Sequence, residues 1–174
     1  AEALLKGSGA FIRHDQQSRA FYRPASDSIH LPHRSQFHDS NGYYATALHE
    51  LAHWTGHSSR LNRDQQGAYG TADYAREELR AEIGAYFICA TLGIPSKVHN
   101  HASYIDSWCA SLAEDHNELF RAARDAARIQ DFILQSAPNM TPTSLETQQS
   151  SNVAKLDLRE LGKRAGSVSL PHPP

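Results

Sequence analysis

The chain has 174 residues, a formal net charge of −2 with histidine neutral, and 40% hydrophobic residues. These values are typical of a globular domain with its own core, and they argue against a chain-wide nucleic-acid clamp. No apolar run approaches the ~20 residues of a membrane helix, and no signal peptide is visible at the start. Two cysteines without C-x-x-C spacing predict neither a disulfide framework nor a zinc knuckle. We therefore expect a cytoplasmic protein with no membrane partner, and Ala1 at the start suggests a fragment of a longer protein.

The first third of the chain predicts a small antiparallel sheet or meander. Three short extended segments, residues 10–13, 20–23 and 28–31, are separated by polar and proline-containing turns. Several histidines occur at irregular spacing in this region, and we expect most of them in turns or at the surface: His14, His30, His33 and His38.

The stretch His49-Glu50-Leu51-Ala52-His53 predicts a metal site on a helix. It reads H-E-x-x-H, and three residues that can cap a helix precede it, at positions 39–41. Residues i and i+4 lie on the same face of a helix, so His49 and His53 can direct two imidazole nitrogens at one zinc ion. Glu50 is offset by ~100° and lies beside the metal, where a general base is needed. The alternative is a surface helix with two solvated histidines.

A third ligand must come from elsewhere, and residues 75–87 are the best source. Glu78 and Glu82 share the i, i+4 spacing beside an apolar face, so a helix that buries this face carries both carboxylates inward. An unpaired carboxylate is costly there, and a metal would resolve that cost. We assign Glu78 as the third ligand and Glu82 as acceptor for the N–H of a ligand histidine. The reverse assignment is open, as is an ordinary surface ion-pair pattern, and we expect Glu77 to be solvated.

His57 is a second candidate for the third ligand, because the segment continues as H-E-x-x-H-x-x-G-H. The metzincin pattern requires a histidine two residues later, where Ser59 stands. Met140 is the only methionine and lies in a polar tail, which argues against a Met-turn under the site. We therefore expect His57 near the cleft and not on the metal.

The rest of the chain predicts helices and then a polar tail. A polar loop at 58–70 precedes the carboxylate helix, which should start at Thr71 or Asp73 and run to about residue 92. Further helices are expected from Asn100 and from Asp115. Residues 1–135 thus form one domain, whereas residues 136–174 are rich in Ser, Thr, Pro and Gln and should be largely disordered, with a short amphipathic helix at 153–164.

Several segments resemble the zincin-like metallopeptidase domain of ArdC antirestriction proteins and TraC-type plasmid primases. The segments are residues 43–46, 49–57, 59–61, 74–82 and 101–105. The resemblance implies an α+β, zincin-like fold with a small sheet followed by a helical part that carries the HExxH helix and a second carboxylate-bearing helix. It also implies a conjugative-plasmid context and gluzincin-type ligands, which ranks Glu78 above Glu82. In the family, a domain that binds single-stranded DNA usually comes first, and nothing in this chain matches it.

The residues and the resemblance together predict a zinc-dependent metallopeptidase. His49, His53 and Glu78 would hold Zn²⁺, or another divalent metal such as Mn²⁺, with one position open to water. Glu50 would accept the water's proton and pass it to the leaving amine of a protein or peptide substrate. The alternative is a non-catalytic, zinc-stabilised module that protects or binds transferred single-stranded DNA. The sequence leaves the oxyanion donor open among His57, Tyr74, His101 and Tyr104.

Overall fold

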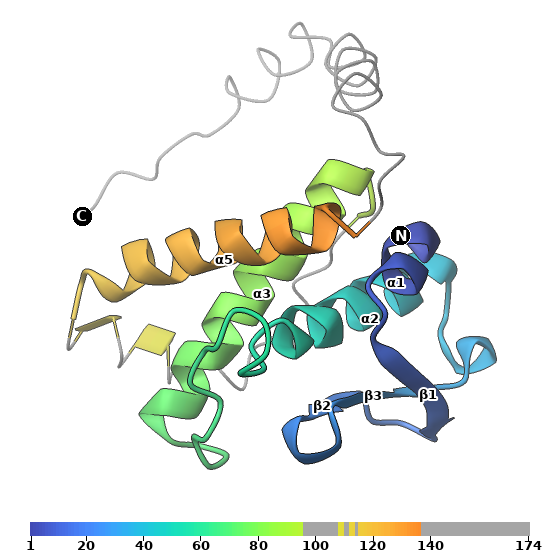
Figure 1. The fold of residues 1–174 in the computed structure, drawn as a ribbon, viewed down its shortest axis with the longest axis horizontal. Helices are drawn as coiled ribbons and strands as arrows, with labels where there is room; N and C mark the ends of the chain where they lie inside the picture. Colours follow the sequence, from blue (N-terminus) through green and yellow to red (C-terminus); the bar gives the residue numbers. More distant parts are fainter. Residues whose placement is uncertain (96–107, 110–111, 114, 137–174) are drawn as a thin grey trace, which may run out of the picture. The chain divides into compact units, whose positions relative to one another are not determined.

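The computed structural model describes residues 1–95, 108–109, 112–113 and 115–136, all within the unit formed by residues 1–138. Its elements are α1 (Glu2–Gly7), β1 (Phe11–Gln16), β2 (Phe21–Arg23), β3 (Ser28–Pro32), α2 (Ser40–Trp54), α3 (Ala72–Leu92) and α5 (Glu118–Leu134), with 3-10 turns at Pro24–Ser26 and Arg34–Gln36 (Figure 1). Most of the helix expected from Asn100 lies outside the described residues. So do the expected tail beyond residue 136 and its helix at 153–164.

The three strands form a mixed sheet in the order β1-β3-β2. β2 runs antiparallel to β3, with Tyr22 opposite Ile29, whereas β1 runs parallel to β3, with Phe11 opposite Ser28. The three strands occur where the sequence predicts them, but the expectation of a purely antiparallel sheet is wrong. β3 is buried along its whole length and takes the central place between the other two strands. The chain therefore passes from β1 to the far side of β3 before it returns, which leaves β1 parallel to β3.

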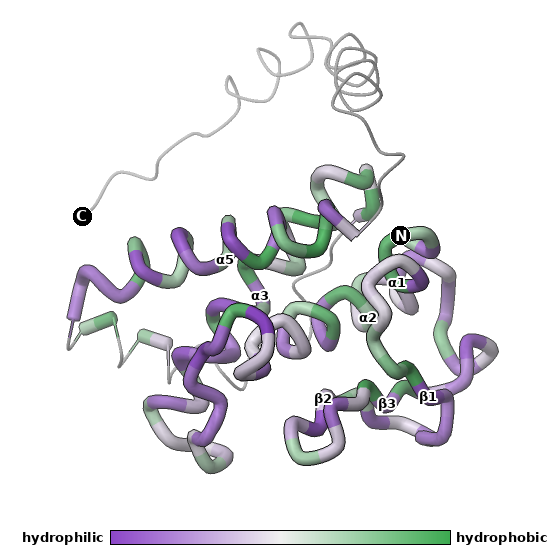
Figure 2. Tube along the Cα trace, in the orientation of Figure 1, coloured by the Kyte–Doolittle hydropathy of each residue, from purple (hydrophilic) through white to green (hydrophobic). Residues whose placement is uncertain are grey.

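The helical part packs around α2 and α3. α2 contacts the sheet on one side and α3 on another, and α3 contacts α5, which crosses it in Figure 1. The core of this part consists of residues with no or very little exposure, including Ala47, Leu48, Leu51, Ala81, Ile88, Ala122, Ala126, Ile129 and Ile133. Hydrophobic and hydrophilic residues alternate along α5 in Figure 2, as expected for a helix with one buried face. A Cβ on Gly84 would lie 3.0 Å from Ile129 Cγ2, so glycine permits the close crossing of α3 and α5.

Both site-bearing helices begin and end at defined residues. The Asp39 side chain caps α2 by accepting a hydrogen bond from the Gly42 backbone N–H at 2.7 Å, and Thr71 does the same for α3 from Tyr74 at 3.3 Å. Gly93 ends α3 in the left-handed conformation, with φ of 65°. These caps agree with the predicted boundaries and set the start of each helix relative to the residues of the site. Among the described helices, none combines the length and apolar character needed to cross a membrane.

Candidate metal centre

α2 and α3 bring two imidazoles and one carboxylate to a common point. His49 Nε2 and His53 Nε2 lie 3.2 Å apart. Glu78 Oε1 lies 3.3 Å from His53 Nε2, and Glu78 Oε2 lies 3.6 Å from His49 Nε2. One ligand atom from each residue falls within 4.8 Å of the other two. Since these are atoms that bind divalent metals, and all three are aimed at one place, the residues present fit a single metal ion.

The local sequence explains this convergence. α2 buries Ala47, Leu48 and Leu51, which fixes its rotation and leaves the i, i+4 histidines on the side that faces α3. α3, which packs against α2, has small buried residues at Ala81 and Ala85 on the turns that follow Glu78 and Glu82.

A second carboxylate contacts the other ring nitrogen of each histidine. His49 Nδ1 lies 3.2 Å from Glu82 Oε2, and His53 Nδ1 lies 3.2 Å from Glu77 Oε1. Both rings can therefore donate their Nδ1 hydrogen to a carboxylate and keep the Nε2 lone pair toward the central point. Glu82 therefore lies beside His49, where its spacing of four residues from Glu78 suggested.

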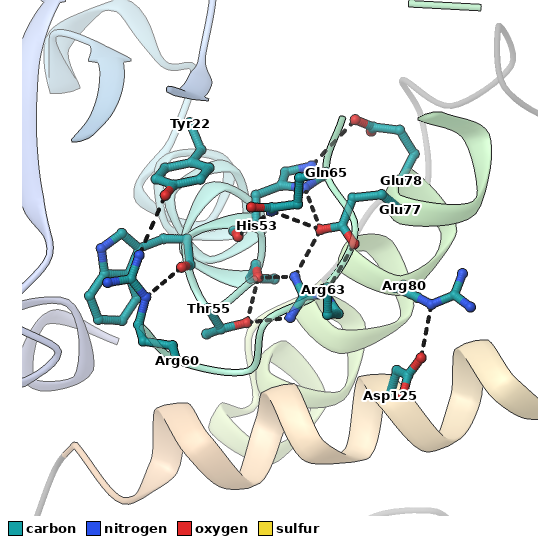
Figure 3. Close-up of polar contacts among 12 residues, drawn as sticks. Tyr22, His53, Thr55, Arg60, Arg63, Gln65, Glu77, Glu78, Arg80 and Asp125 are labelled. Atoms are coloured by element: carbon teal, nitrogen blue, oxygen red, sulfur yellow. Dashed lines mark hydrogen bonds and ion pairs between the residues drawn. The ribbon is translucent and has the colours of Figure 1, made fainter. Parts of the chain in front are cut away.

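Glu77 is the clear departure from the sequence-based expectation. We expected a solvated side chain, yet Glu77 is 7% exposed and lies at the centre of a polar network (Figure 3). The guanidinium of Arg63 donates to both of its oxygens, at 3.0 and 2.8 Å, and Gln65 donates to one of them at 3.1 Å. Glu77 is buried because the loop after α2 covers this side of α3. Helical spacing within α3 carried no signal for Arg63 or Gln65, since both lie in an irregular loop.

The charges of these groups perturb one another strongly. Burial would lower the pKa values of both histidines. The carboxylates of Glu78 and Glu82 overcome this effect and raise the pKa of His49 to about 10, and those of Glu77 and Glu78 raise the pKa of His53 to about 9. Burial conversely opposes ionisation of the glutamates. Hydrogen bonds from His53 and Arg63 nevertheless lower the pKa of Glu77 to about 2, and those from His49 and His53 hold the pKa of Glu78 far below its usual value. In the metal-free chain the anionic side chains thus hold protons on the imidazoles, where a cation would otherwise bind.

The central point opens into a cleft of about 880 Å³ between the sheet and the two helices. The proposed ligands line it together with Glu50, which is 6% exposed, and with Tyr22 from the edge strand β2. Tyr74 also lines the cleft. His57 is not among the residues that line the cleft; it lies just beyond the end of α2, and its Nδ1 lies 2.8 Å from Ser59 Oγ at the exposed start of the following loop. His101 and Tyr104 lie outside the described residues.

An HExxH helix, a glutamate from the next long helix and a small sheet beside them define a zincin-like domain. The chain belongs to the zincin-like metallopeptidase family MPTase-PolyVal, whose family model matches residues 1–125. This membership confirms the predicted family and the α+β fold class.

Curated relatives and solved structures agree with this assignment. Two DNA primases TraC from Escherichia coli are 56% and 54% identical over 134 residues, or 77% of this chain, which spans only 13% and 9% of their length. An uncharacterized protein, y4eC, from Sinorhizobium fredii is 40% identical over 76% of this chain and 43% of its own. Structures of the antirestriction protein ArdC from plasmid R388 are 41% identical over 80% of this chain and about half of theirs. Their TM-scores are 0.74 for the Mn(II)-bound form and 0.72 for the metal-free form.

Proposed function

We propose that this chain is a metal-dependent peptidase domain in which His49, His53 and Glu78 hold one divalent ion and Glu50 is the general base. The observation that carries the proposal is the convergence of two imidazole Nε2 atoms, 3.2 Å apart, on the two oxygens of Glu78. Neutral imidazole nitrogens and carboxylate oxygens bind Zn²⁺. Carboxylate oxygens also suit Mn²⁺, which is the harder ion. The ArdC relative supports Mn²⁺ as the alternative ion, since one of its structures is Mn(II)-bound.

The remaining residues account for acid–base work and orientation. When bound, the ion supplies Lewis acidity toward a substrate carbonyl and acidifies a water molecule. Glu50 lines the same cleft and sits one residue after His49, so its carboxylate can accept a proton from that water and donate it to the leaving amine. Glu82 and Glu77 each lie 3.2 Å from the Nδ1 atom of one histidine, so they can accept the Nδ1 hydrogens and hold the rings in this orientation.

A peptide library tests the proposal. The chain is loaded with Zn²⁺ or with Mn²⁺, incubated with peptides from a digested bacterial proteome, and analysed by mass spectrometry for new termini. The matched control is Glu50→Gln, which keeps the shape of the side chain and removes the base. We expect cleavage by the unaltered chain and none by Glu50→Gln, although both bind the metal. Equal cleavage by both proteins, or metal binding without any cleavage, would contradict a peptidase with Glu50 as base.

A second function is favoured by what the relatives are called, namely DNA primases and an antirestriction protein. In this alternative the domain is a non-catalytic, metal-stabilised module of a longer protein that protects or binds transferred single-stranded DNA. The two candidates differ in their need for Glu50. In a longer protein that contains this domain, Glu50→Gln should abolish a protective effect that depends on peptide hydrolysis, whereas unchanged protection of incoming DNA would favour the binding module.

A further inference from the structure

The loop that follows α2 returns to the metal centre through Arg63. Its side chain is 7% exposed, although the residue belongs to an irregular polar segment. The guanidinium donates to both oxygens of Glu77, to Thr55 Oγ1 at 2.7 Å and to the Ala52 carbonyl at 2.7 Å (Figure 3). Arg63 thus links the last turns of α2, which carry His53, to Glu77, the carboxylate on α3 that contacts His53. Such a two-pronged contact between guanidinium and carboxylate fixes the plane of both groups.

The packing around this contact leaves little freedom. A Cβ on Gly56 would lie 2.9 Å from Arg63 Nη2 and 2.5 Å from Gln65 Nε2, so glycine makes room for both side chains. Gln65 Nε2 in turn donates to the His53 carbonyl at 2.6 Å and to Glu77 Oε1 at 3.1 Å. The loop therefore contacts both the backbone of His53, a proposed metal ligand, and Glu77, the carboxylate beside the His53 imidazole.

The chemistry of the pair indicates what this arrangement does. The Glu77 carboxylate is 3.2 Å from His53 Nδ1, so it can hold the hydrogen there and leave Nε2 as the ligand atom. A carboxylate this deeply buried is costly unless a cation accompanies it, and Arg63 is the cation that remains beside Glu77 when His53 is a neutral metal ligand. Removing Arg63 would leave Glu77 free to rotate toward water or to shift its contact with His53.

We propose that Arg63 is a positioning residue for the metal centre, which acts through Glu77 to fix the orientation and tautomer of His53 and thereby sets the affinity for the metal. The inference rests on the proposed metal site and goes beyond it, because it couples the conformation of the loop after α2 to metal binding. A loop that is pulled away from α3 releases Glu77 and weakens the site.

Arg60 offers a matched control from the same loop. Its side chain is 10% exposed, donates to the Trp54 carbonyl at 2.7 Å, stacks on the Trp54 ring at 3.8 Å and pairs with Asp27. It thus ties the end of α2 to the sheet region, much as Arg63 ties it to α3. Loss of either arginine should lower stability, but only loss of Arg63 should reach His53.

The test compares zinc affinity and the His53 imidazole in the full chain. Zinc affinity is measured by competition with a chromogenic chelator for the unaltered chain, Arg63→Met, Arg63→Lys, Glu77→Gln and Arg60→Met. We expect Arg63→Met and Glu77→Gln to weaken zinc binding by about 10- to 100-fold, and Arg60→Met by less than about twofold. Arg63→Lys, which restores the charge, should recover part of the loss. In zinc-loaded, ¹⁵N-labelled protein, the Nδ1 hydrogen of His53 should exchange with water faster in Arg63→Met than in Arg60→Met.

The measured zinc affinities distinguish a positioning role of Arg63 from a purely structural one. Equal zinc affinities for Arg63→Met and Arg60→Met, with both melting temperatures lowered, would overturn the inference and leave Arg63 a structural residue. Should Arg63→Met fail to fold, Arg63→Lys and Glu77→Gln take its place, and unchanged affinity in both overturns the inference equally. An unaltered chain that binds no zinc would instead contradict the proposed metal site itself.

Discussion

Without metal, the chain should lose stability as the pH rises from about 6.5 to about 9. The carboxylates around His49 and His53 raise their pKa values to about 10 and about 9, despite burial, from an unfolded value of 6.5. A group whose pKa is higher in the folded state holds its proton more tightly there. Its contribution to stability is therefore complete below the unfolded pKa and is lost as the pH rises through the folded one.

The smaller of the two pKa changes, that of His53, sets the size of the loss in stability. A rise in the pKa of His53 from 6.5 to about 9 corresponds to roughly 3 kcal/mol of unfolding free energy. The two Nε2 atoms lie 3.2 Å apart, so two protonated rings repel each other and titrate as a coupled pair; one change, not the sum, sets the scale. Burial also raises the pKa values of Cys89 and Tyr22, from 9.0 and 10.0, and these groups add to the loss only above that range.

Urea unfolding in the presence of a chelator measures this loss. Midpoints are recorded by tryptophan fluorescence at about pH 6.5, 7.5 and 9, and converted to free energies by linear extrapolation. The matched variant is Glu78→Gln, which removes a carboxylate that contacts both imidazoles, so its loss of stability over the same range should be smaller. Saturating zinc should reverse the trend, because only neutral imidazole binds the metal. Stability that is constant or increases with pH in the metal-free chain would refute the electrostatic description of the site.

Three further predictions concern single positions. The pKa of Glu77 is lowered from 4.5 in the unfolded chain to about 2 in the folded one, which corresponds to roughly 3 kcal/mol of unfolding free energy. This contribution is present above pH 4.5 and is lost as the pH falls toward 2. Urea unfolding across this range should show a shallower loss for Glu77→Gln, and an unchanged slope would count against the buried ion pair. Glu78→Gln should weaken zinc binding by more than about 10-fold in chelator competition, whereas His57→Ala should change it by less than about twofold. The reverse result would make His57 the third ligand. Gly67→Ala should cost about 1–3 kcal/mol in thermal unfolding, because its Cβ would lie 2.4 Å from the Tyr74 backbone nitrogen, and a neutral result would contradict the close approach of loop and helix.

The predicted parts of the site are those that depend on local helical geometry. His49 and His53 share a face because they are four residues apart on one helix, and the same spacing places Glu82 near the site once Glu78 is there. Helix ends were predictable for a similar reason, since Asp39, Thr71 and Gly93 act on their own turns. In each case the relevant physical interaction spans only a few residues, so the pattern is visible in the sequence.

The parts that escaped prediction depend on contacts between distant segments. Whether β1 pairs parallel or antiparallel is decided by which strand is buried enough to take the centre, and the strand patterns alone do not contain that order. Glu77 reads as a solvated neighbour of Glu78 because its partner, Arg63, lies 14 residues away in a loop without periodicity. Irregular loops carry little positional signal, although here the loop supplies the cation that lets a buried carboxylate exist.

Anomalous scattering from crystals of the chain grown with zinc would show directly whether residues of α2 and α3 bind one ion. We expect one strong peak at about 2.0–2.2 Å from His49 Nε2, His53 Nε2 and an oxygen of Glu78, with Glu82 and Glu77 still beside the Nδ1 atoms. A peak that lacks any one of these three ligands, or that recruits His57 in place of Glu78, would contradict the proposed site.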